Sequence, residues 1–175
     1  MTWVNQSDST LQGSSSQAAN TFLGGPVSGG AIAPVYRALV AADIPATWTT
    51  PTFAAGNFTA SGAMTWTVAA GNVNVYQYMV LGKTMTITFN ISGTTVGGVA
   101  ATTLQLAIPG GFLAAKAFSP STFSYSDAGT AGVGQVDTGT AAGSSTLRLL
   151  KNNLAINWTV GAGTNVAGQI TFEVQ

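Results

Sequence analysis

From residue 52 onward, apolar and polar residues alternate in short runs that are rich in threonine, other β-branched residues and aromatic residues. Because strand side chains point alternately to two faces, this period of two predicts strands with one buried face. Gly, Asn, Ser and Pro separate the runs at intervals of about 8 to 15 residues, which is typical of a β-sandwich or jelly roll. The predicted strands are Met64–Ala69, Val73–Val80, Thr84–Ile91, Thr103–Ile108, Thr122–Tyr125, Thr146–Leu150, Leu154–Val160 and Gln169–Val174.

Two connections between these runs are short enough to predict hairpins. One is Leu81–Lys83, which contains a glycine, and the other is Lys151–Asn153, where asparagine tolerates the left-handed conformation. Ser126–Gly143 is instead a long Gly-, Ala- and Thr-rich segment, with at most one short strand at Gly134–Val136. We expect that segment to be an exposed loop region.

The N-terminal part has a different texture. Residues 1–20 are rich in Ser, Gln and Asn, and four of the six prolines fall within the first 51 residues. Proline restricts φ and removes a backbone donor, so this part is expected to be extended and broken into short pieces. We therefore predict an N-terminal anchor (1–20), an extended trimerisation arm (21–50) and a β-sandwich head (51–175). The fold class is all-β: a jelly-roll-like antiparallel β-sandwich after an extended N-terminal arm.

The arm carries apolar residues that an extended segment cannot bury against itself. They need a partner surface, most simply the same arm in neighbouring subunits. Arg37 and Asp43 lie six residues apart and are predicted to form a clamp between subunits or a cap, since a guanidinium binds a carboxylate well. The expected inter-subunit contacts are Phe22, Leu23, Val35, Tyr36, Arg37, Leu39, Asp43 and Ile44.

The composition excludes several classes of function. Only 6% of the residues are charged, against about 25% in an average domain, and the formal net charge is zero. Without a basic patch we expect no nucleic-acid partner, and without an 18-residue apolar run we expect no membrane insertion. The chain has neither Cys nor His, so disulfides and the commonest metal ligands are absent, and we expect no metal and no cofactor.

Catalysis would need paired carboxylates, as in glycosidases. Asp127 and Asp137 lie in one Gly-rich segment and could form such a pair, but turn-capping roles are the more common use of Asp in such loops. We expect no enzyme and no catalytic residues. Trp66 and Trp158 alternate with Thr in predicted strands and are expected in the core rather than in a sugar-binding platform. The candidate ligand-facing loop residues are Phe123, Tyr125, Asp127 and Asp137.

Residues 19–45 resemble a linker that is found in many bacteriophage tail-fibre and related virion proteins. The matching residues are Ala19–Thr21, Gly25–Pro26, Ser28–Gly29, Ala33–Pro34, Tyr36–Leu39 and Asp43–Pro45. The Thr-rich remainder is similar to the β-sandwich heads that follow such linkers. The resemblance implies a homotrimeric projection on the virion surface, made in the cytoplasm of the host bacterium.

Two roles follow from this resemblance. In the first, the protein is a short surface fibre that is anchored to tail or baseplate proteins through residues 1–50 and binds host surface polysaccharide with its head. In the second, it is a capsid decoration (cement) protein whose arms fasten neighbouring capsomers of the major capsid protein. The short segment before the linker and the low charge favour decoration, whereas the usual occurrence of such linkers in tail-fibre proteins favours a fibre.

Overall fold

The computed structural model describes residues 19–40, 43–44, 46–151 and 156–175. Its contacts divide the chain into two compact units, Met1–Pro45 and Ala46–Gln175. We call them the N-terminal unit and the head. The sequence predicts residues 46–50 to be part of the arm, but they fall in the head, where Thr49 exchanges backbone hydrogen bonds with Tyr78. Within the described ranges, no helix has the length and apolarity that crossing a membrane requires.

The N-terminal unit contains a two-stranded antiparallel sheet. Strand β1 (Thr21–Gly24) pairs with β2 (Val35–Ala38), with Thr21 opposite Ala38 and Gly24 opposite Val35. Pro26 and Pro34 lie in the connection between the strands, where a missing N–H costs no ladder hydrogen bond. The short extended pieces that the proline content predicts are present. The two strands pair with each other and form a hairpin.

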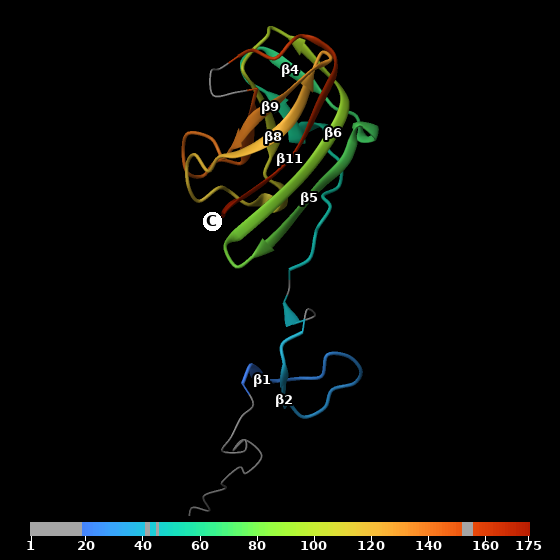
Figure 1. Cartoon of the computed structure of the whole chain (residues 1–175), viewed down its shortest axis with the longest axis vertical. Helices are drawn as coiled ribbons and strands as arrows, with labels where there is room; N and C mark the ends of the chain where they lie inside the picture. Colours follow the sequence, from blue (N-terminus) through green and yellow to red (C-terminus); the bar gives the residue numbers. More distant parts are fainter. Residues whose placement is uncertain (1–18, 41–42, 45, 152–155) are drawn as a thin grey trace, which may run out of the picture. The chain divides into compact units, whose positions relative to one another are not determined.

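The head is an all-β fold with one nine-stranded antiparallel sheet (Figure 1). The strand order is β3-β7-β10-β9-β8-β11-β6-β4, and β5 pairs with β6 beside β4. The strands are β3 (Phe58–Ala60), β4 (Met64–Thr67), β5 (Val73–Leu81), β6 (Thr84–Gly98), β7 (Thr103–Ala107), β8 (Ser121–Asp127), β9 (Thr130–Asp137), β10 (Thr146–Leu150) and β11 (Gly161–Glu173). Short 3-10 turns, η2 (Ala55–Asn57), η3 (Ala70–Asn72) and η4 (Pro109–Gly111), lie between some of them.

The sheet curls until its two ends nearly meet, which gives a barrel-like sandwich. Strands β3 and β4 stand at opposite ends of the strand order, yet only residues 61–63 connect them. The inward faces form one apolar core, whose largest fully buried side chains include Trp158 and Phe89. Strand β6 contributes Met85, Ile87 and Phe89 at every second position, as its sequence pattern predicted.

A β-bulge changes which residues of β6 face inward. Ile91 is buried, but the next buried residues are Thr94 and Val96, so the alternation changes parity at Gly93. Gly93 has φ +68°, and the register between β6 and β11 shifts here. The bulge buries the hydroxyl of Thr94. This hydroxyl accepts a hydrogen bond from Trp66 Nε1 at 2.9 Å and donates one to the carbonyl of Thr164 at 2.8 Å.

Most of the predicted strands are confirmed, as is the hairpin at Leu81–Lys83. Strands β5 and β6 close through Gly82–Lys83, with Leu81 opposite Thr84 and Gly82 at φ +61°. The predicted strand Leu154–Val160 is wrong for its described part, because residues 156–160 form no strand, although Trp158 is buried as expected. The predicted turn at Lys151–Asn153 lies largely outside the described residues.

The predicted loop Ser126–Gly143 is also wrong over most of its length. Strand β8 continues to Asp127, and β9 runs from Thr130 to Asp137. Ala128 and Gly129 both have positive φ, at +48° and +86°, which suits a two-residue hairpin turn. The glycines that suggested a loop instead allow the β8 rings Phe123 and Tyr125 to lie close against β9 at Gly134 and Gly132.

Candidate assembly surface and candidate ligand pocket

Arg37 is the centre of the contacts within the N-terminal unit. Its Nη1 and Nη2 donate to the two carboxylate oxygens of Asp43, each at 2.6 Å, and its Nε donates to the carbonyl of Gly25 at 2.8 Å. The guanidinium also lies over the ring of Phe22, 4.8 Å from the ring centroid. The carboxylate in turn accepts the N–H of Val40 at 2.9 Å. The pair therefore ties together both ends of the hairpin within one chain.

These charges perturb each other in the direction that a tight pair requires. The hydrogen bonds from Arg37 and then from the Val40 N–H lower the pKa of Asp43 to about 2, and the carboxylate raises the pKa of Arg37. The structure thus assigns Arg37 and Asp43 a capping contact inside the chain. Their predicted contact across a subunit boundary stays a prediction.

Large apolar side chains of the N-terminal unit remain exposed in the single chain. Leu39 is 58% exposed and Ile32 64% exposed, and neither finds cover from the hairpin. The exposed members of the predicted contact set are Leu23, Val35, Tyr36, Leu39 and Ile44, while Phe22 is half-buried beneath Arg37. Val27, Ile32 and Val40 add to the same exposed set. We call these residues the assembly surface.

The predicted ligand-facing loop does not exist as such. Phe123 is 3% exposed, and its ring centroid lies 6.2 Å from that of Phe89 in the core. Tyr125 is half-buried and packs edge-on against Trp158, with the ring centroids 5.5 Å apart. Phe123 and Tyr125 lie two apart in β8, as the predicted strand Thr122–Tyr125 requires, so alternation directs both rings to the same packed face. Phe123 is therefore a core residue, whereas Tyr125 also lines a shallow hollow beside Asn90 and Asn165.

Asp127 and Asp137 are not a catalytic pair either. Both are buried, and each has its own cationic partner: Lys151 Nζ lies 2.6 Å from Asp127, and Arg148 Nε lies 2.7 Å from Asp137. They mark opposite ends of the β8–β9 hairpin, because Asp127 lies opposite Thr130 and Asp137 ends β9. The seven-residue step from Thr130 to Asp137 spans roughly 23 Å of backbone at roughly 3.3 Å per residue. Glycosidase pairs stand about 5 to 9.5 Å apart.

Both aspartates instead complete local hydrogen-bond networks. Asp127 also accepts from the N–H and the hydroxyl of Thr159, the latter at 2.8 Å, and Asp137 also accepts from the Gly139 N–H at 2.8 Å. Buried carboxylates with this many donors fix the segments after β9 and after residue 155. The prediction that they cap turns describes them better than the ligand-facing role does.

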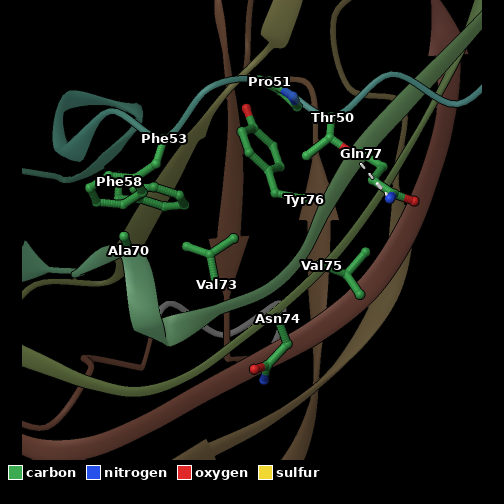
Figure 2. A pocket seen from close by; sticks show the side chains of 10 residues that line it. All are labelled: Thr50, Pro51, Phe53, Phe58, Ala70, Val73, Asn74, Val75, Tyr76 and Gln77. Atoms are coloured by element: carbon green, nitrogen blue, oxygen red, sulfur yellow. Dashed lines mark hydrogen bonds between the residues drawn. The ribbon is translucent and has the colours of Figure 1, made fainter.

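The head contains a pocket that the sequence reasoning missed, shown in Figure 2. Its volume is about 180 Å³, and it lies between β5 and the segment that follows Thr49. The lining residues are Thr50, Pro51, Phe53, Phe58, Ala70, Val73, Asn74, Val75, Tyr76 and Gln77. All ten are uncharged.

The aromatic residues form a stack at one side of this pocket. Phe53 stacks on Phe58 with ring centroids 6.0 Å apart, and Phe58 packs edge-on against Trp66 at 5.6 Å. Phe58 is buried, whereas Phe53 is 39% exposed. Tyr76 lies at the back, where its hydroxyl donates to the carbonyl of Ala107 and where burial raises the pKa of the phenol. Tyr76 is therefore a structural wall of the pocket rather than an acid or base.

Polar groups lie at the other side of the pocket. Gln77 Nε2 donates to the hydroxyl of Thr50 at 3.1 Å (dashed in Figure 2), and Asn74 Nδ2 donates to Ser92 Oγ at 2.9 Å. Each amide keeps its carbonyl oxygen for another donor. No composition or periodicity signal pointed to this site, because Thr50–Phe58 and Val73–Gln77 meet only in the fold.

Ion pairing leaves the described surface nearly without free charge. Of the chain's ten charged side chains, eight form the pairs Arg37–Asp43, Lys116–Glu173, Arg148–Asp137 and Lys151–Asp127. Asp8 lies outside the described residues, and Lys83 forms no ion pair with any of them. Within the described part, no three acidic side chains gather as a metal site would require.

No protein-family model, no curated protein and no solved structure matches this chain.

Proposed function

We propose that this chain is a non-enzymatic structural protein of a bacteriophage particle: a short trimeric surface fibre that is attached through its N-terminal unit. The head would be exposed for binding host surface polysaccharide. The proposal starts from the linker resemblance of residues 19–45. The observation that carries it furthest is the assembly surface, because a stable unit does not leave so many large apolar side chains in water without a partner.

The N-terminal unit is suited to fastening rather than to chemistry. Arg37 and Asp43 hold the β1–β2 hairpin from within, so its apolar side chains are displayed on a defined backbone. Three such hairpins could cover one another, as obligate interfaces do over areas on the order of 2,000 Å² or more. A trimer would carry three heads, so that weak binding of each head to a repeating polysaccharide would add up to a high overall avidity.

Capsid decoration is the second candidate, and the same observation supports it. Exposed apolar residues require cover, but they do not select another copy of the chain over the major capsid protein as the partner. The nearly uncharged surface is compatible with both, since neither arrangement needs electrostatic steering.

Immunogold labelling of intact particles with antibody against residues 51–175 separates the two candidates. We expect gold confined to the tail, which would make a screen of host polysaccharides the next step. Gold scattered over the capsid would establish decoration instead. Absence of label from particles that are shown to be intact would contradict both roles.

A further inference from the structure

We propose that the pocket along β5 binds one ring of an uncharged saccharide, with Phe53 as its stacking surface. This inference rests on the proposed function and deepens it, because it assigns the host glycan a site and a chemical class.

The position of the pocket follows from an incomplete sheet edge. Strand β5 pairs with β6 on one side, and on the other side the described residues offer it a single bridge, at Thr49. Tyr78 uses both its N–H and its C=O in that bridge, at 3.0 and 2.8 Å. In an antiparallel strand, residues two apart direct their backbone groups to the same side, so those of Tyr76 point toward the pocket.

The lining then provides the two kinds of contact that a sugar ring needs. Phe53 stacks on Phe58 and is 39% exposed as a residue, so its ring is available to cover the C–H face of a sugar. The Gln77 amide, held by Thr50, keeps its oxygen to accept a hydroxyl proton, and the backbone N–H of Tyr76 donates. These groups surround one cavity and come from two segments (Figure 2).

The charge of the lining residues and the volume of the pocket limit the class of ligand. None of the ten lining residues is ionisable to a cation or a carboxylate, so the pocket offers no counter-charge to a uronic or sialic acid. A neutral hexose or N-acetylhexosamine carries no such requirement. At about 180 Å³ the cavity is smaller than the roughly 300 to 1,000 Å³ of pockets for drug-sized ligands. It therefore takes one ring of a chain, and the rest of the polysaccharide lies outside.

The test uses the full chain and an array of neutral hexose and N-acetylhexosamine oligosaccharides beside sialylated and uronic-acid oligosaccharides. We expect binding to neutral members, followed by calorimetry on the best of them. Phe53→Ala should weaken that binding about tenfold, which corresponds to about 1.4 kcal/mol. Gln77→Ala should weaken it less. Phe118→Ala is the matched control, because Phe118 is 56% exposed and lies outside the pocket.

Salt dependence gives a second readout. Because no charge takes part, the affinity should stay constant between about 50 and about 500 mM NaCl. A preference for acidic oligosaccharides, or neutral binding that Phe53→Ala leaves unchanged while the melting temperature is also unchanged, would overturn the site. The fibre proposal would survive that result, since particle labelling tests it separately.

Two further outcomes would also overturn the assignment. One is the absence of binding to any oligosaccharide on the array. The other is binding of an uncharged Thr/Val peptide in place of the sugars, lost on Phe53→Ala, which would make the β5 edge a site for strand addition.

Discussion

Arg37 shows how one side chain organises a segment that lacks a core of its own. Its guanidinium uses its planar fork on Asp43, reaches the Gly25 carbonyl and covers the Phe22 ring. Lysine could satisfy one of these contacts, but it has no fork. Arg37 thereby joins β1, the connection after it and the segment that follows β2.

The Asp43 carboxylate should titrate with a midpoint near pH 2 in the full chain, as followed by the NMR shift of its carboxyl carbon. Because its folded pKa lies below the ordinary 3.8, the stabilisation is complete above about pH 4 and is lost as the pH falls through 2. Arg37→Gln should return the midpoint toward 3.8. A midpoint near 3.8 in the unmodified chain would contradict the pair.

Asp137→Ala should destabilise the head by about 3 to 5 kcal/mol in urea unfolding, because it leaves the largely buried Arg148 without its partner. Glu173→Gln is the matched control: Glu173 is exposed and lies 3.9 Å from Lys116, so its loss should cost less than about 1 kcal/mol. Equal effects of the two variants would show that the Asp137 network contributes little.

At the scale of elements, the β8–β9 hairpin depends on close approach between rings and glycines. A Cβ added at Gly132 would lie 2.5 Å from Tyr125 ring atoms, and one added at Gly134 would lie 2.5 Å from the Phe123 ring. The aromatic residues of β8 can therefore lie flat across β9. This explains why a segment with the composition of a loop forms a strand that is paired on both sides.

Gly134→Ala should lower the head's free energy of unfolding by about 1 to 3 kcal/mol, because the new methyl group meets the Leu150 carbonyl at 2.4 Å as well as the Phe123 ring. Gly71→Ala adds the same methyl group where nothing lies within 4 Å, and its effect should stay within about 0.5 kcal/mol. Urea denaturation measures both. A tolerated Gly134→Ala would mean that β9 can move away from β10.

At the scale of the whole molecule, the chain divides its tasks between two units with different surfaces. The head buries a large apolar core around Trp158, although Trp48, Phe118, Val133 and other apolar side chains stay exposed on it. The described residues of the N-terminal unit are far fewer, expose as many large apolar side chains and contribute none to a buried core. Changes to the assembly surface should therefore act on association and leave the stability of the head unaffected.

Analytical ultracentrifugation of the full chain should give a mass three times that of one chain. The double variant Leu23→Asp/Leu39→Asp should sediment with the mass of a single chain. A charge cannot be buried in an apolar interface without a large cost. Val133→Asp places the same charge at a 67% exposed valine of the head and should leave the trimer intact. A monomeric unmodified chain at micromolar concentration would contradict the trimer.

The sequence by itself determined the all-β class, most strands of the head, the Gly82–Lys83 hairpin and the buried tryptophans Trp66 and Trp158. Period-two alternation and turn chemistry are properties of neighbouring residues, so they are legible without the fold. The same reasoning failed for Ser126–Gly143, because composition does not distinguish a flexible glycine from one that lies beneath an aromatic ring.

Only the tertiary structure decided the roles of the acidic residues and the place of the pocket. Asp127 meets Lys151 and Thr159, and Phe53 meets Phe58 beside Val73–Gln77, through pairings between distant segments. Burial of a carboxylate depends on which cation the sheet order brings to it, and a pocket depends on where a strand edge is left uncovered. Both depend on the order of strands in the sheet, which local patterns do not specify.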